Sequence, residues 1–230
     1  MSTLLIAGVD TEIGKTVLTT ALAAYWQAYC QPRRLGLMKP IQAGAGDREH
    51  YRQLFDLDQS VEEITPLFFE APIAPPLAAE KERREVDLAV VWQTYDQLAK
   101  SRDWVLIESL GGLGSPITHE LTVADLAADW RLPVVLVTPV KLGAIAQTVA
   151  NVALARQVGV QLKGIVLNCV QPCSEVDIAN WTPMDLIQSL TQIPILGVIP
   201  HLSDPTDLSK LVQVASNLDM ERLLPKAVCS

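Results

Sequence analysis

The sequence predicts an α/β fold with a mostly parallel sheet and helices on both faces of that sheet. Short apolar runs rich in β-branched residues alternate along the chain with segments whose apolar residues recur at helical spacing. Strands that are apolar throughout are typical of parallel sheets buried on both faces. The chain has 230 residues, of which 49% are hydrophobic. We therefore expect residues 1–230 to form a single domain with a large core.

Each expected element follows from this alternation. The apolar runs predict strands over Leu4–Val9, Leu35–Lys39, Trp104–Glu108, Val134–Val140, Gly164–Asn168 and Ile195–Ile199. The periodic segments between them predict helices over Lys15–Cys30, Arg48–Phe55, Asp87–Ser101, Ala144–Val158, Pro183–Thr191 and Thr206–Leu218. The proline-rich segment Thr65–Pro76 is expected to be an irregular surface connection.

The most informative segment lies between the first strand and the first helix. Residues 8–16 read GVDTEIGKT, a glycine-bounded loop that ends in Gly-Lys-Thr. The backbone N–H groups of such a loop can bind an anion, and the following helix adds the positive end of its dipole. Lys15 can then reach the β- and γ-phosphates, and the Thr16 hydroxyl can bind Mg²⁺. The loop predicts nucleoside triphosphate binding and a fold like that of the P-loop NTPases.

The loop departs from the standard pattern by one residue. The standard pattern has four residues between its first glycine and the Gly-Lys pair, whereas Gly8 and Gly14 enclose five. An ordinary strand-to-helix turn is the alternative interpretation. The apolar strand before the loop and the helical spacing after it favour a phosphate-binding loop.

Polar residues close several of the expected strands. Ligands of open parallel sheets bind outside the carboxyl ends of the strands. The second to fifth strands end in or just before a polar residue, and together these residues predict one site at that edge: Lys39, Glu108, Lys141 and Asn168.

Two carboxylates and one lysine have specific roles at this edge. Glu108 caps an apolar strand, where a carboxylate commonly binds the Mg²⁺ that accompanies a nucleotide; an N-cap or a salt-bridged strand end is the alternative. Asp47 opens a short helix as an N-cap or as a second Mg²⁺ ligand. Lys39 precedes Pro40, which favours an extended backbone, so its ammonium can stabilise a transferring phosphoryl group or an anionic acceptor. A solvated surface lysine is the alternative.

Composition excludes several classes of function. The formal net charge of −8 disfavours nucleic acid and anionic membranes as partners. No apolar run reaches the length of a membrane span, and the N-terminal residues lack a basic region and a cleavage site, so we expect a cytoplasmic protein. Cys30, Cys169, Cys173 and Cys229 are scattered and are expected to be reduced structural thiols. Ser109 lacks the flanking glycines of a serine hydrolase nucleophile.

Taken together, these motifs resemble the dethiobiotin synthetase family, the ATP-dependent ligases of biotin biosynthesis. GVDTEIGKT is similar to the lengthened phosphate loop of that family. The resemblance continues through LMKPIQAG, WVLIESLGGLGSPIT, LPVVLVTPVKLGAI, GIVLNCV and LGVIPHL, and so covers most of the chain. It implies a P-loop NTPase-like fold, ATP and Mg²⁺ as cofactors, and a cyclo-ligase activity.

The reaction implied by the resemblance closes a ring. CO₂ adds to one amine of 7,8-diaminononanoate (7,8-diaminopelargonate) to give a carbamate, whose oxygen attacks the γ-phosphate of ATP. The second amine then displaces phosphate from the mixed anhydride, which gives dethiobiotin and ADP in the penultimate step of biotin biosynthesis. The family acts as a homodimer in which the substrate site is shared across the interface, so a homodimer is implied here.

The resemblance also implies roles for individual residues. The catalytic residues would be Thr11, Lys15 and Lys39, and Mg²⁺ would be held by Thr16, Asp47 and Glu108. The nucleotide would contact, besides these Mg²⁺ ligands, Glu12, Ile13, Gly14, Lys15, Val17, Ser109, Leu110, Gly111, Asn168, Cys169, Pro200, His201 and Leu202. Within this set, Asn168 would read adenine. The diamine substrate would contact Lys39, Ala43, Leu142, Gly143, Ala144 and Ile145.

Three positions depart from the family pattern or stay open. Ala43 replaces the usual Ser or Thr, and Ser109-Leu110 replaces the usual Gly-Ala pair. Glu49 lies two residues after Asp47, so either carboxylate could be the metal ligand.

Two other classes of ATP-dependent protein are alternatives. Partitioning-type ATPases carry a lysine five residues before the loop lysine, where this chain has Asp10. Amidotransferase-type cobyrinate synthases need a further domain with a nucleophilic cysteine and a partner histidine, for which 230 residues leave no room. The ligase interpretation is therefore favoured.

Overall fold

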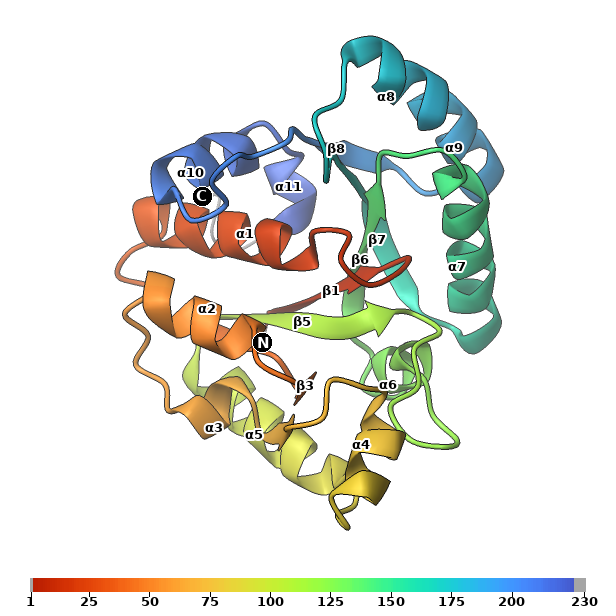
Figure 1. The fold of residues 1–230 in the computed structure, drawn as a ribbon. Coiled ribbons are helices and arrows are strands. Elements are labelled where there is room, and N and C mark those ends of the chain that lie inside the picture. Colours follow the sequence, from red (N-terminus) through yellow and green to blue (C-terminus); the bar gives the residue numbers. More distant parts are fainter. Residues whose placement is uncertain (1, 226–230) are drawn as a thin grey trace.

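The computed structural model describes residues 2–225, and its main sheet is parallel throughout (Figure 1). The strand order within the described residues is β2-β5-β1-β6-β7-β8. The strands are β1 (Thr3–Gly8), β2 (Leu35–Met38), β5 (Trp104–Gly112), β6 (Pro133–Pro139), β7 (Gln161–Asn168) and β8 (Ile195–Ile199). The predicted fold class, a mostly parallel sheet with helices, is confirmed.

Helices cover both faces of this sheet, because each right-handed crossover places its helix on the face set by the direction of strand addition. One face is covered by α1 (Lys15–Tyr29), which packs against α10 (Leu208–Ser216). The other face carries α5 (Leu88–Ser101), α6 (Val123–Asp129), α7 (Ala144–Val158) and α9 (Met184–Thr191). The remaining helices of residues 2–225 are α2 (Asp47–Leu54), α3 (Val61–Ile64), α4 (Pro75–Lys81), α8 (Glu175–Trp181) and α11 (Met220–Leu223).

The core is formed by the central strands and the helix that follows the first of them. Residues 4–7, 104–107 and 134–137 are buried, as expected for strands covered on both faces. Trp26 of α1 packs against Trp104, with 5.0 Å between the ring centroids. The indole Nε1 of Trp26 donates a 2.9 Å hydrogen bond to the carbonyl oxygen of Arg33, so its polar group is satisfied within the core.

The expectation for residues 65–76 was wrong. This segment contains β4 (Leu67–Phe69), which pairs in parallel with β3 (Ile41–Ala43) in a second, two-stranded sheet, and it ends in the first turn of α4. Three-residue strands are too short to show periodicity, and their pairing joins segments more than twenty residues apart. The sequence pattern also missed α6 and α8, and it ended the third strand of the prediction at Glu108 rather than Gly112.

Cys30 and Cys169 are buried and Cys173 is half-buried, while Cys229 lies outside the described residues. Among the helices of residues 2–225, none is long and apolar enough to cross a membrane.

Candidate functional site

The phosphate loop joins β1 to α1 at the carboxyl edge of the sheet. Gly14 takes a left-handed backbone conformation with φ of 93° and serves as the N-cap of α1. Lys15 is only 6% exposed, and its Nζ donates a 2.9 Å hydrogen bond to the carbonyl oxygen of Asp10 across the loop. The loop therefore encloses the Lys15 side chain, and the N-terminus of α1 borders the cavity described below.

Two carboxylates and a hydroxyl meet next to this loop. Thr16 Oγ1 lies 3.0 Å from Asp47 Oδ1 and 3.0 Å from Glu108 Oε1. These residues come from the starts of α1 and α2 and from β5, so three separate elements bring three oxygen ligands to one point. Oxygen atoms of this kind are the ligands that Mg²⁺ prefers.

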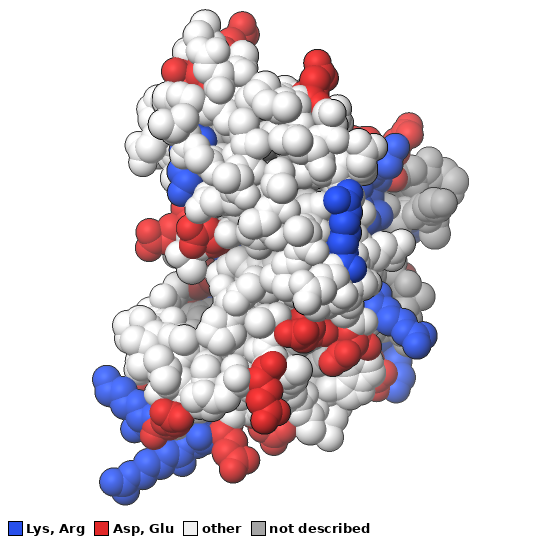
Figure 2. All heavy atoms as spheres, turned by 90° about the vertical axis from the view of Figure 1, so that its right-hand side faces the viewer, with Lys and Arg blue, Asp and Glu red and all other residues white. Residues whose placement is uncertain are grey.

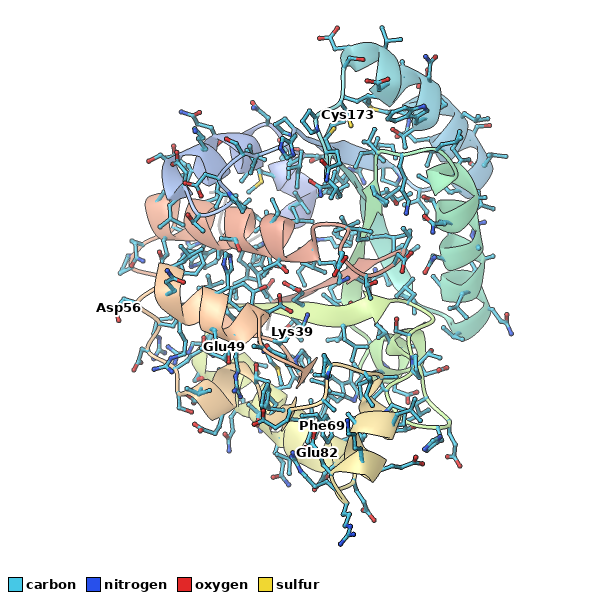
Figure 3. All side chains as sticks on the ribbon, in the orientation of Figure 1. Lys39, Glu49, Asp56, Phe69, Glu82 and Cys173 are labelled. Atoms are coloured by element: carbon cyan, nitrogen blue, oxygen red, sulfur yellow. The ribbon has the colours of Figure 1, made fainter. Side chains whose placement is uncertain are left out.

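Lys39 lies in the same cluster, between β5 and the start of α2 (Figure 3). Its Nζ is 2.6 Å from Asp47 Oδ2 and 2.9 Å from Glu108 Oε1, and it also donates to the Ser109 carbonyl oxygen at 3.0 Å. The side chains of Lys39 and Glu108 are almost completely buried. This one ammonium pairs with both carboxylates of the cluster.

The protonation of the cluster follows from this arrangement. Burial disfavours the charge of Lys39, but Glu108 and Asp47 outweigh it and raise the Lys39 pKa above its ordinary value. Burial likewise opposes ionisation of Asp47, but Lys39 and a hydrogen bond from Thr16 lower the Asp47 pKa. Burial and then the neighbouring charge of Lys39 lower the Lys15 pKa to about 8. Lys39 and Asp47 are therefore ionised at neutral pH.

A cavity of about 600 Å³ opens beside the cluster, a volume typical of small-molecule sites. One wall is the phosphate loop with the charged cluster. An apolar part of the lining is formed by Pro72, Ile73, Ala74 and Pro75. The sequence did not assign these residues to the site, because the segment was expected to be an irregular surface connection. The cavity brings together many of the predicted site residues, namely Thr11, Glu12, Ile13, Gly14, Lys15, Thr16, Lys39, Ala43, Asp47, Glu108, Leu110 and Gly111.

Other predicted site residues do not line this cavity. Ser109 points to the opposite face of β5 from Glu108, as the alternation of a strand requires, and lines a cavity of only about 20 Å³. Its Oγ has no hydrogen-bond partner among residues 2–225, and only its carbonyl oxygen reaches the cluster. Also outside the cavity are Val17 in α1, Cys169, Pro200, His201 and Leu202 after β7 and β8, and Leu142, Gly143, Ala144 and Ile145 at the start of α7.

Asn168 lies behind the phosphate loop. Its Nδ2 donates a 2.8 Å hydrogen bond to the carbonyl oxygen of Ile13, and the residue is 4% exposed. In the structure this side chain supports the loop, and the adenine contact remains a prediction.

The structure separates the two acidic candidates on α2. Asp47 faces Thr16 and Lys39, whereas Glu49 Oε2 accepts hydrogen bonds from the Gly46 backbone N–H and from Gln42 Nε2. Glu49 therefore closes the N-terminus of the helix. Sequence reasoning missed Tyr51, whose hydroxyl donates to Glu108 Oε2; its position four residues after Asp47, on the same helix face, is the signal that could have revealed it.

Gly14→Ala should disrupt the loop. A Cβ at this position would lie 2.0 Å from Asn168 Nδ2, and the left-handed φ disfavours any residue with a side chain. We expect nucleotide affinity to fall by tenfold or more, measured by calorimetry. Gly159→Ala is the control, because Gly159 also has a left-handed φ, but an added Cβ there meets nothing within 4 Å. Equal affinity in the two variants would contradict the prediction.

Comparison with known proteins shows the family. Residues 2–208 match the family described as an AAA domain. The ATP-dependent dethiobiotin synthetase BioD of Gloeothece citriformis (strain PCC 7424) is 60% identical over 98% of this chain and 100% of its own length. The chain belongs to the dethiobiotin synthetase family. Another relative of the same name, from Synechocystis sp. (strain ATCC 27184 / PCC 6803 / Kazusa), is 50% identical over 96% of this chain and 94% of its own length. As a member of this family the protein is an enzyme.

Solved structures agree with a P-loop ATPase fold. A ParA family ATPase from Chlorobium tepidum TLS has a TM-score of 0.56 and covers 97% of this chain and 98% of its own, at 14% identity. The MinC:MinD cell division protein complex of Aquifex aeolicus contains a chain with a TM-score of 0.56 that covers 96% of this chain and 94% of its own, also at 14% identity. At this identity the likeness shows the fold alone, while membership of the dethiobiotin synthetase family comes from the sequence relatives.

Proposed function

We propose that this protein carboxylates 7,8-diaminononanoate with CO₂ and closes the ureido ring at the expense of ATP, giving dethiobiotin, ADP and phosphate. The observation that carries the proposal is a single cavity with two unlike walls. The phosphate loop and buried lysines form one wall, and residues 72–75 form an apolar wall suited to the alkyl chain of the diamine. We further propose that residues 1–230 form one cytoplasmic ligase domain without nucleic acid or membrane partners.

The chemistry needs positioned charge rather than a covalent enzyme intermediate. One substrate amine attacks CO₂ and loses a proton, which gives a carbamate. The carbamate oxygen attacks the γ-phosphorus of ATP and ADP leaves; the second amine then attacks the carbonyl carbon and displaces phosphate. Lys39 and Lys15 can stabilise the negative charge on the carbamate and the transferring phosphoryl group, because both ammonium groups border the cavity in buried surroundings. Thr11, also on the cavity wall, is proposed as a further contact to the reacting groups.

The oxygen cluster fits Mg²⁺. Within residues 2–225 there is no group of three His, Cys, Asp or Glu side chains that could hold a metal unaided. Two carboxylates and a hydroxyl are instead the donor set expected for an ion that keeps several waters and shares phosphate oxygens. Thr16, Asp47 and Glu108 would hold it, and the ion would supply neutralisation of the phosphate charge.

We propose a homodimer whose second subunit completes the substrate site. Leu142, just before the N-cap of α7, is 83% exposed and lies outside the cavity of its own chain. The start of α7 beside it offers N–H groups to a carboxylate. The side of the molecule on which α7 and α9 lie carries few charged side chains in its central part (Figure 2). On α8 and α9, Val176, Met184, Leu186 and Leu190 expose apolar surface. The molar mass in solution, measured by light scattering, tests this arrangement.

Product analysis tests the reaction. The purified protein is incubated with 7,8-diaminononanoate, bicarbonate, ATP and Mg²⁺, and dethiobiotin is sought by mass. Product that forms only with all four components supports the proposal. ATP hydrolysis without product would support a partitioning-type ATPase instead, although Asp10 stands where those proteins carry a lysine.

ATP affinity should fall as the pH rises through about 8. The pKa of Lys15 is about 8, so the side chain is mostly protonated at pH 7 and mostly neutral at pH 9. Phosphate binds the charged form better, so we expect about tenfold weaker binding at pH 9 than at pH 7. Calorimetry across this range measures the effect. In Lys15→Arg the charge persists at all these pH values, and the dependence should disappear. An unchanged affinity of the natural chain up to pH 9 would contradict the prediction.

A further inference from the structure

Glu108 is held at both of its carboxylate oxygens. Oε1 accepts hydrogen bonds from Lys39 Nζ at 2.9 Å and from Thr16 Oγ1 at 3.0 Å, on the side that faces the cavity. Oε2 accepts from the hydroxyl of Tyr51, and no other donor to this oxygen is found in the described part of the chain. Donors on both oxygens prevent rotation of the carboxylate about its last bond.

Tyr51 reaches Glu108 from α2, the helix that also carries Asp47. Residues four apart lie on the same face of a helix, so one helix face supplies both the Asp47 carboxylate and the Tyr51 hydroxyl. Tyr51 is fully buried and does not line the 600 Å³ cavity. Its hydroxyl therefore touches Glu108 but has no contact with the space available to substrates.

The Tyr51 hydroxyl keeps its proton and so remains a hydrogen-bond donor, and neighbouring side chains fix the position of its ring. Burial and then the charge of Glu108 raise the pKa of Tyr51 well above its ordinary value, so the proton stays on the phenol. His50 packs against the Tyr51 ring edge-on, with 5.9 Å between centroids, and its Nε2 lies 3.3 Å from Thr20 Oγ1 in α1. The ring is thus held between α2 and α1. Hydrophobic packing alone would be satisfied by phenylalanine, so the phenol oxygen needs a separate explanation.

We propose that Tyr51 is a positioning residue, whose hydroxyl fixes the Glu108 carboxylate so that Oε1 meets Thr16 Oγ1 and Asp47 Oδ1 at the Mg²⁺ position. The proposal rests on the function proposed above and deepens it. It makes the Mg²⁺ dependence of nucleotide binding, rather than nucleotide binding as such, the property that Tyr51 controls.

Without the hydroxyl, Glu108 Oε2 would remain buried and lose its donor. A buried oxygen without a partner is costly, and rotation of the carboxylate toward other donors would relieve that cost. Rotation would take Oε1 out of register with Thr16 and Asp47. The lost positioning should appear only when the metal is bound, because ATP without metal does not use Glu108.

The test compares Tyr51→Phe with the natural chain by titration calorimetry of ATP, once with Mg²⁺ and once with a chelator. The natural chain should gain affinity with Mg²⁺, and in Tyr51→Phe this gain should be about tenfold smaller, while affinity without metal stays the same. Tyr95→Phe is the matched control, because the Tyr95 hydroxyl lies 3.2 Å from Thr3 Oγ1, away from the cluster. Its gain should equal that of the natural chain.

The possible outcomes are distinct. An equal Mg²⁺ gain in Tyr51→Phe and the natural chain would overturn the role of Tyr51 and leave the ligase proposal standing. A natural chain that gains nothing from Mg²⁺ would overturn both the metal site and the role of Tyr51. A purely structural role of Tyr51 would lower both ATP affinities together and would also overturn the proposal. Tyr51→Phe keeps the buried ring and removes one oxygen, and a variant that failed to fold would lose ATP affinity with and without Mg²⁺ alike, which would overturn the proposal.

Discussion

The Lys39→Ala variant should bind ATP and form almost no dethiobiotin. Lys39 Nζ borders the cavity within 3 Å of both carboxylates of the cluster, so its charge acts where the carbamate and the γ-phosphate would meet. Loss of a preorganised charge of this kind lowers the turnover number by about 10²–10³-fold. Turnover measured by product mass and ATP affinity measured by calorimetry together check the prediction.

The same variant has a second expected property. Asp47 and Glu108 lose the ammonium that balances them, so free Mg²⁺ should compete for them more successfully and its half-saturating concentration should fall. Loss of one partner from a buried ion pair costs about 3–5 kcal/mol of stability. Thermal unfolding of the variant is therefore measured with Mg²⁺ present, because the ion can replace the missing charge. The control is Lys100→Ala, since the Lys100 side chain is exposed on α5 and pairs with Asp96. Normal turnover in Lys39→Ala would refute the catalytic role of Lys39.

The Lys15→Ala variant should lose ATP binding itself. Lys15 is the cation at the centre of the phosphate loop, 6% exposed and tied to the Asp10 carbonyl oxygen. Charge-assisted hydrogen bonds contribute about 1.5–3 kcal/mol, which corresponds to a 10- to 150-fold loss of affinity, and product formation should fall at least as far. Lys39→Ala and Lys15→Ala are thus expected to separate chemistry from binding.

Calorimetry and product mass again provide the measurement for Lys15→Ala. Lys210→Ala is a suitable control, because Lys210 belongs to α10 and its side chain is 57% exposed. ATP affinity and turnover that match the natural chain would remove the basis for a phosphate-binding loop at residues 8–16.

The main sheet could be predicted because its signal is local. Each central strand is an apolar run, and a segment with apolar residues at helical spacing follows it. The polar residues after these runs indicate the edge of the sheet at which the strands end. The β3–β4 pair could not be predicted, since two three-residue strands carry no period and join distant segments. The apolar wall of the cavity depends on that pairing, and it was missed for the same reason.

The site was predicted as a set of residue types rather than as a geometry. Lys39, Asp47 and Glu108 follow from strand and helix ends, but only the structure shows that Lys39 pairs with both carboxylates. Ser109 could have been assigned to the other face of β5 from strand alternation alone. The contact of Asn168 could not be predicted, because no sequence pattern reveals that its amide donates a hydrogen bond to the Ile13 carbonyl oxygen.

The ion triangle of Lys39, Asp47 and Glu108 has a consequence for the folding of this chain. In proteins with structural metals, carboxylates repel one another until the ion arrives, and removal of the ion unfolds the domain. Here an internal ammonium already lies within hydrogen-bond distance of both carboxylates, and the second lysine of the cluster, Lys15, is buried beside them. The chain should therefore fold without Mg²⁺, with the two carboxylates already held in place for the ion. Chelation of the proposed Mg²⁺ should therefore lower activity and leave the fold intact.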